Sequence, residues 1–147
     1  MWDFTKARFI EADVMRYDTP GDWEGDTITA WKGMPFLSQR AVQLHEFNES
    51  AILRAAGITE EQIDIIDNFH VAASNFSKGL ISKDELAECA SLYYKIPWNL
   101  RELYDFAHDI CLILERTFLE ASGGNWQEHE QIIENTRGKI PIKAINI

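Results

Sequence analysis

Hydrophobic and polar positions alternate in the first part of the chain, and this alternation predicts β-structure there. Residues 26–31 (Asp-Thr-Ile-Thr-Ala-Trp) alternate with a period of two, and residues 7–12 could form a second short strand. The segment 17–23 contains adjacent proline and glycine residues, which are typical of turns. We therefore expect a short β-hairpin or small sheet within residues 1–35.

The pattern changes to helical spacing from residue 36 onward. The first expected helix ends at Gly57, and a second begins with a capping box formed by Thr59 and Gln62 and ends before Gly79. Further helical segments are expected at residues 82–94, 98–122 and 125–135. The sequence therefore predicts a bundle of four to five helices.

These elements together predict an α+β fold that is mostly α. The 147 residues favour a single domain over residues 1–147, with a β or irregular part at 1–35, a helical body at 36–136 and an extended tail at 137–147. The tail is β-prone, so it could pack on the strands or on a partner. The apolar helix at 98–122 could also form the seam of a homodimer.

The chain is acidic, with 24 Asp and Glu residues against 14 Lys and Arg residues and a net charge of −10. This charge argues against nucleic-acid binding through a basic patch, and it is compatible with binding cations or a basic protein surface. The two cysteines, Cys89 and Cys111, are not spaced as CxxC and are interpreted as buried free thiols. The chain has no apolar run for a membrane span and no signal-peptide pattern, so we expect a cytoplasmic protein.

The best functional clue is the run His45-Glu46-Phe47-Asn48-Glu49. His45 and Glu49 are four residues apart, so on a helix their side chains lie on one face. Imidazole nitrogens and carboxylate oxygens are ligands for zinc, iron or manganese. In HExxH enzymes the glutamate after the first histidine is the general base that activates water, and Glu46 has that place here. The alternative interpretation is an ordinary polar helix surface.

The expected helix at 98–122 carries a second pair of candidate ligands. His108 and Glu115 are seven residues apart, which is two turns along one face, and Tyr104 lies one turn earlier. Their helix is otherwise strongly apolar, and burying these two side chains is costly unless they are paired or bind a metal. The pair therefore predicts either metal ligands or a His–Glu hydrogen bond that fixes the packing of the core.

Asp64 and Asp67, one turn apart on the second helix, could supply a further carboxylate or could form a solvated acidic edge. We expect a metal site in which Glu46 is the catalytic base and one aspartate or Glu115 completes or orients the ligand set; the candidate ligands are His45, Glu49, His108, Asp64, Asp67 and Glu115. Two histidines with carboxylates suit zinc best, with iron or manganese as alternatives. The other two histidines are interpreted as a core residue (His70) and a solvent-facing one (His129), and the five tryptophans as core or capping residues.

Several short motifs follow one another in a recognisable order. They are residues 15–23 (Met-Arg-Tyr-Asp-Thr-Pro-Gly-Asp-Trp), residues 44–51 with the HExxE run, residues 57–64, the set Tyr104, His108 and Glu115, and residues 124–126. This order resembles that of a group of small, uncharacterised phage and bacterial proteins. The resemblance implies a phage or prophage origin, and hence the host cytoplasm, but it implies no established activity.

A strand followed by a helix with HExxE also resembles the minimal core of zincin metallopeptidases, with Glu49 in place of the second histidine. The leading hypothesis is therefore a metal-binding, zincin-like protein that acts as a metal-dependent hydrolase of peptide or other amide bonds. The second is a non-enzymatic, acidic phage accessory protein that binds and modulates a host protein. The third is a helical nucleotide pyrophosphohydrolase with magnesium at Asp64 and Asp67, although magnesium prefers oxygen ligands to histidine.

Overall fold

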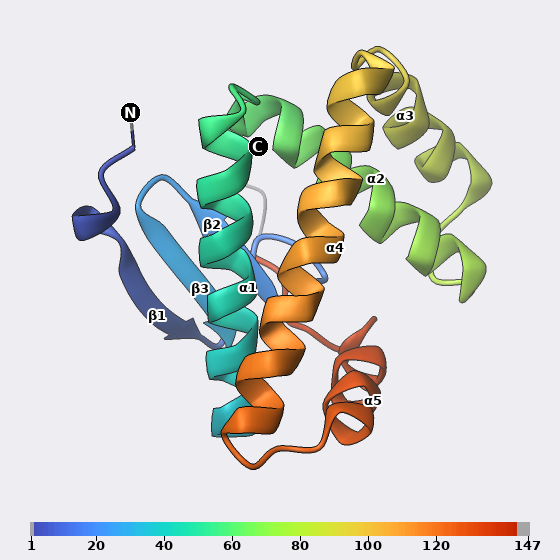
Figure 1. Cartoon of the computed structure of the whole chain (residues 1–147). Helices are drawn as coiled ribbons and strands as arrows, with labels where there is room; N and C mark the ends of the chain where they lie inside the picture. Colours follow the sequence, from blue (N-terminus) through green and yellow to red (C-terminus); the bar gives the residue numbers. More distant parts are fainter. Residues whose placement is uncertain (1, 144–147) are drawn as a thin grey trace.

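A computed structural model describes residues 2–143, which form a small three-stranded sheet and a helical body (Figure 1). The strands are β1 (Arg8–Ala12), β2 (Gly21–Glu24) and β3 (Thr27–Trp31), and the helices are α1 (Phe36–Ala55), α2 (Glu60–Ser77), α3 (Lys83–Tyr93), α4 (Trp98–Ala121) and α5 (Trp126–Thr136). The α+β, mostly α, fold expected from the sequence is confirmed.

The sheet has the strand order β1-β3-β2, with β3 parallel to β1 and antiparallel to β2. Ile28 and Ala30 of β3 are fully buried while their neighbours are partly exposed, which is the expected period of two. Residues 21–23, which were expected to form part of a turn, instead begin β2, so that prediction was wrong. The tight turn lies at Gly25, with φ of +57°, and the glycine at position 21 has a packing role.

The helix ends follow the sequence signals closely. Thr59 and Gln62 form the expected capping box of α2, and Ser82 forms a second one with Glu85 at α3. Gly57, after α1, has a φ of +83°, which only glycine adopts readily. The lengths of these helices are therefore set by local chemistry.

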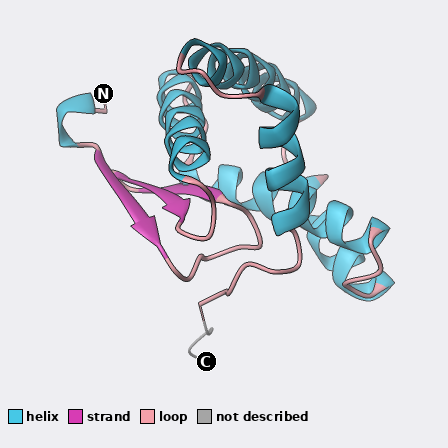
Figure 2. Cartoon of the chain, turned by 90° about the horizontal axis from the view of Figure 1, so that it is seen from below, coloured by secondary structure: helices cyan, strands magenta, loops and turns pink. Residues whose placement is uncertain are grey.

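Helix α1 is buried on two sides because it packs against the sheet and against α4 (Figures 1 and 2). Leu37 at the start of α1 lies beside Gly124, after the end of α4, so the two helices run antiparallel. Leu53 of α1 contributes to the main core together with Ile28 of β3 and Ala107 of α4. This arrangement places the middle of α1 against the middle of α4.

The segment after α5 returns to the sheet region, where Ile142 forms a parallel β-bridge with Met15. The expected packing of the tail near the strands is seen for this part, and residues 144–147 lie outside the described part of the chain. Among the described residues, no helix has both the length and the apolar character needed to cross a membrane.

Gly21 allows β2 to lie directly against α1. A Cβ atom at this position would lie 2.4 Å from Cγ1 of Val42 and 2.8 Å from Oε1 of Glu46. We expect Gly21→Ala to lower the free energy of unfolding by about 1–3 kcal/mol, because the added methyl overpacks this contact. Urea denaturation of the two proteins measures the change, and equal unfolding free energies would contradict the close packing.

Candidate metal centre

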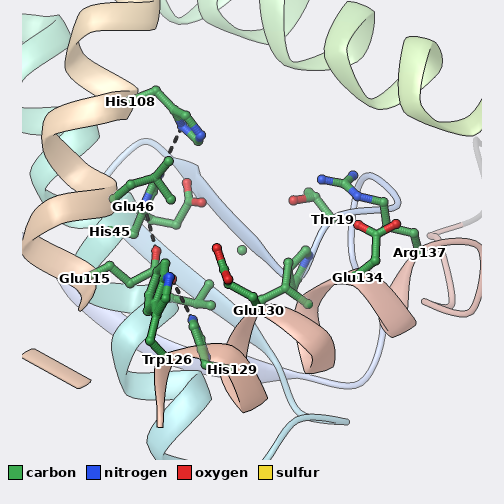
Figure 3. Close-up of a pocket in the computed structure, with 15 residues that line it drawn as sticks. Thr19, His45, Glu46, His108, Glu115, Trp126, His129, Glu130, Glu134 and Arg137 are labelled. Atoms are coloured by element: carbon green, nitrogen blue, oxygen red, sulfur yellow. Dashed lines mark hydrogen bonds and ion pairs between the residues drawn. The ribbon is translucent and has the colours of Figure 1, made fainter. Parts of the chain in front are cut away.

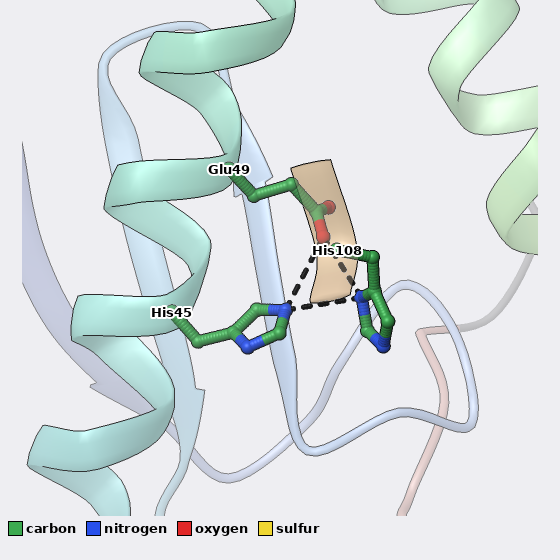
Figure 4. A group of neighbouring side chains, drawn as sticks. All are labelled: His45, Glu49 and His108. Carbon is green, nitrogen blue, oxygen red and sulfur yellow. Dashed lines mark hydrogen bonds and ion pairs between the residues drawn. The ribbon is translucent and has the colours of Figure 1, made fainter. Parts of the chain in front are cut away.

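Three side chains from α1 and α4 meet at one point, as Figure 4 shows. Nε2 of His45 lies 3.2 Å from Oε2 of Glu49 and 3.2 Å from Nδ1 of His108. Nδ1 of His108 lies 3.0 Å from the same Glu49 oxygen. These three residues could hold a metal ion. The structure thus brings together positions 45 and 108, which are distant in the sequence.

The spacing of the three atoms suits a small cation. Tetrahedral ligands at the usual zinc distances of about 2.0–2.1 Å from the metal lie about 3.3–3.4 Å from one another. The observed triangle has edges of 3.0, 3.2 and 3.2 Å. Both histidines also line the adjacent cavity.

Helix geometry explains why these atoms converge. His45 and Glu49 are one turn apart on α1, and both are buried on the side that faces α4. The buried residues of α4 recur every three or four positions; they are Tyr104, Ala107, Cys111, Glu115 and Leu119. His108 lies at the edge of this stripe, and its side chain remains 43% exposed. The amphipathic pattern of α4 therefore aims the imidazole of His108 at α1.

Glu115 and His129 continue the cluster behind His45 (Figure 3). Oε1 of Glu115 lies 2.8 Å from Nδ1 of His45, as an ion-pair contact that is not aligned as a hydrogen bond. The other Glu115 oxygen lies 2.6 Å from Nε2 of His129, and Nδ1 of His129 lies 2.9 Å from the Ser38 hydroxyl. A carboxylate behind a histidine fixes its ring orientation and strengthens it as a ligand. Glu115 was expected either to complete the ligand set or to orient a ligand, and its position behind His45 fits the second role.

The electrostatics of the cluster favour a bound cation or a bound proton. Burial by itself would lower the pKa of His45, but the carboxylates of Glu115 and Glu49 outweigh it and raise the pKa to about 11. Burial would raise the pKa of Glu49, but His108 and His45 hold it at about 2. Two buried carboxylates thus surround one imidazole, and this negative charge requires a compensating positive charge.

No known protein family matches this chain. No curated protein and no solved structure matches it either. The chemistry of the centre is therefore inferred from its own side chains.

Glu46 lines the same cavity as His45 and His108 (Figure 3). Burial, followed by the negative charge of Glu49, raises the pKa of Glu46 well above its usual value, while His45 opposes this rise. A raised pKa means that the carboxyl keeps its proton to a higher pH than a free carboxyl does. Glu46 thus shares the cavity of the candidate ligands His45 and His108, as a carboxyl that holds its proton more firmly than a free one.

The two candidate aspartates of α2 have different surroundings. The Asp64 carboxylate lies 3.3 Å from the Arg16 guanidinium, in a cluster that also contains Asp22. Asp67 lines the cavity beside the candidate ligands and accepts a hydrogen bond from the Tyr104 hydroxyl. Burial, followed by the charge of Glu49, raises the pKa of Asp67 to about 8. Of the two, Asp67 is therefore the one near the centre.

The sequence interpretations of four further side chains were wrong. His129 was expected to face solvent, yet it is only 2% exposed. Its signal was present in the sequence, because Trp126, His129 and Ile133 share one face of α5 at spacings of three and four. His70 was expected in the core but is exposed, at the edge of the cavity near Asp105. Trp98, expected as a core or capping residue, is 64% exposed, and Cys89, expected to be buried, is only partly buried.

The contact between Glu115 and His45 gives a prediction for metal affinity. We expect Glu115→Gln to weaken zinc binding by about 10–100-fold, the usual effect of removing a carboxylate that orients a histidine ligand. The matched control is Glu120→Gln, which changes an exposed carboxylate on the same helix. Competition titrations with a zinc chelator measure both affinities, and equal weakening in the two variants would contradict the orienting role.

Zinc binding should also depend on pH. With a pKa of about 11, His45 carries a proton at neutral pH in the metal-free protein, and this proton must leave before Nε2 can bind a metal. We expect each zinc ion to displace about one proton, so that apparent affinity rises about tenfold per pH unit. Chelator competition at pH 7 and pH 8 tests this expectation, and an affinity that does not change with pH would contradict it.

Proposed function

We propose that this chain is a zincin-like, metal-dependent hydrolase of peptide or other amide bonds. The observation that carries the proposal is the triangle of Nε2 of His45, Oε2 of Glu49 and Nδ1 of His108, with the Glu46 carboxyl beside it in one cavity. Two imidazoles and a carboxylate are a donor set that suits zinc, with iron or manganese as alternatives.

Each residue of the centre has a distinct role in this proposal. Zinc would supply a Lewis acid that polarises the carbonyl group of the substrate. With the charge of a bound cation offsetting that of Glu49, Glu46 would ionise, accept a proton from the attacking water and deliver it to the leaving nitrogen. Glu115 holds the ring of His45 in place through Nδ1, and His129 holds Glu115 through its second oxygen. Tyr104 and Asp67 form a hydrogen-bonded pair on the wall of the cavity.

The cavity fits a substrate on both sides of the centre. Two adjoining hollows of about 320 and 300 Å³ share His45, Glu46 and His108 in their linings. One extends toward α5, where Leu112, Trp126 and Ile133 provide apolar surface, and the other extends toward α2. A chain with a cleavable bond in its middle would thus have room on either side of that bond.

The replacement of the second histidine by Glu49 is compatible with this function. The carboxylate occupies the corresponding place one turn after His45 and takes the same part in the triangle. A carboxylate carries a negative charge and a neutral imidazole does not. A divalent cation bound with Glu49 would therefore keep less net positive charge than one bound with a second histidine on α1. We expect this to favour tight metal retention over strong polarisation of the substrate.

The test of this function is release of amino groups from a mixed-sequence peptide library. The protein is purified without added metal, loaded with one equivalent of zinc and incubated with the library. Mass spectrometry then identifies new peptide termini. We expect cleavage by the zinc-loaded protein and none after the metal is removed with a chelator. A zinc-loaded protein that leaves the library intact would contradict the peptide-hydrolase proposal and favour the non-enzymatic alternative.

A further inference from the structure

Arg137 is the one lysine or arginine among the described residues that line the two hollows. Arg137 lines both hollows, and so do Thr19, Gly21, His45, Glu46 and His108. The remaining charged residues of the lining are acidic apart from histidines. A single guanidinium in an otherwise acidic cleft is a feature that the proposed hydrolysis does not itself require.

Figure 3 shows where this arginine lies relative to the centre. Arg137 and Thr19 stand on one wall of the hollow, and His108 and Glu46 stand on the opposite wall. A substrate that fills the hollow would therefore contact the metal-binding atoms with one part and the guanidinium with another. The arrangement suits a ligand that has two polar groups separated by a short spacer.

The guanidinium is available for such a contact. Within residues 2–143, no carboxylate forms an ion pair with Arg137 and no side chain forms a hydrogen bond with it. Glu134 on α5 pairs with Lys78 at 2.6 Å, and the positive charge of Arg137 adds a smaller contribution that also lowers the pKa of Glu134. Guanidinium groups bind carboxylates through two parallel hydrogen bonds, which makes them selective for planar anions.

The backbone around Arg137 is held firmly. Gly138, with a φ of +78°, donates its N–H to Oδ2 of Asp18 at 2.7 Å. The same Asp18 oxygen accepts a hydrogen bond from Nδ2 of Asn75 at 3.0 Å, and Asp18 is only 5% exposed. This buried aspartate thus links the segment before Thr19, the end of α2 and the residue after Arg137. Such fixed placement is typical of a residue that recognises a ligand.

We propose that Arg137, with the Thr19 hydroxyl beside it, binds a carboxylate group of the substrate. This inference rests on the proposed function and narrows it to amide substrates with a free carboxylate on the side of the cleft that faces α5 and residue 137. A carboxylate fits better than a phosphate, because a dianion would be repelled by Glu130 and Glu134, which line the same hollow.

Two pairs of zinc-binding probes test the inference: the monohydroxamates of succinic and glutaric acid, and the same compounds with the free carboxylate converted to an amide. The hydroxamate group binds zinc, so the members of each pair differ only at the far end. We expect the better carboxylate probe to bind the zinc-loaded protein at least about tenfold more tightly than its amide, as charge-assisted hydrogen bonds allow. Isothermal titration calorimetry measures the ratio.

Variants assign the preference to the guanidinium. Arg137→Gln is expected to reduce the ratio to about one without changing the affinity of the amide probe, and Arg137→Lys to retain part of the preference. The matched control, Lys139→Gln, changes an exposed charge two residues away that lines neither hollow, and should keep the full ratio.

The outcomes separate this inference from the proposed function. If both members of each pair bind the wild-type protein equally well, the proposed zinc site is unaffected and the proposed role of Arg137 is refuted. A preference that survives Arg137→Gln also refutes it. If no probe binds the zinc-loaded protein, both the metal-dependent function and the inference that rests on it are refuted.

Discussion

His108→Ala is expected to abolish stoichiometric zinc binding and to leave the fold intact. The imidazole supplies one of the three atoms in the triangle, and losing a direct ligand should weaken zinc by more than the 10–100-fold typical of an orienting partner, so we expect at least about 100-fold. The side chain is 43% exposed, so truncating it creates no large buried cavity. Zinc content after dialysis and chelator competition measure the effect.

The matched control is His70→Ala. Its imidazole is 45% exposed and also borders the cavity, yet it is not one of the three candidate metal ligands. We expect this variant to bind zinc as tightly as the unmodified protein. Circular dichroism of both metal-free variants checks that they are folded. Undiminished zinc binding by His108→Ala, or an equal loss in the two variants, would refute the proposed ligand set.

Glu46→Gln is expected to keep zinc bound and to lose hydrolytic activity. Glutamine has the same size but cannot accept a proton from water, so the rate should fall by about 10²–10⁴-fold, the usual contribution of a general base. The substitution should not destabilise the fold. Burial and the charge of Glu49 already disfavour the ionised form of Glu46, and an amide removes that repulsion. Peptide cleavage rates at saturating zinc measure the loss.

Glu130→Gln is the control for this experiment. Glu130 lines the cavity beside α5 and is exposed, so its removal changes the charge of the cleft without removing the carboxyl next to the triangle. We expect it to retain most of the activity. If Glu46→Gln cleaves the library at the rate of the wild type while binding zinc, Glu46 is not the base.

The sequence predicts the elements of this protein well where local chemistry decides them. The capping boxes at Thr59 and Ser82 and the glycine after α1 set the helix ends independently of the rest of the fold. The spacing of His45 and Glu49 likewise fixes their common face. These features depend on residues a few positions apart, which a pattern search can evaluate directly.

Contacts between distant segments were harder to predict. The position of His108 opposite His45 depends on the antiparallel packing of α4 on α1, and the apolar stripe of α4 only made that pairing plausible. The burial of His129 depends on α5 folding back onto Glu115, a contact between different helices. The proline and glycine of residues 17–23 predict a turn, whereas the close approach of Gly21 to Val42 and Glu46 is a tertiary contact that the local pattern does not show.

The role proposed for Arg137 has no signal in the sequence. It lies just after α5, and nothing in its neighbourhood in the chain distinguishes it from an ordinary exposed arginine. Its placement depends on Asp18, which accepts a hydrogen bond from the backbone N–H of Gly138, the next residue, 120 positions further along the chain. Only the folded arrangement brings this guanidinium to the cavity of the metal centre.

Anomalous X-ray diffraction from crystals of the zinc-loaded protein, measured at the zinc absorption edge, tests the central claim most directly. We predict one strong peak about 2.0–2.2 Å from Nε2 of His45, Nδ1 of His108 and Oε2 of Glu49. A fully loaded protein with no peak among these atoms, or with its peak at a different set of side chains, would contradict it.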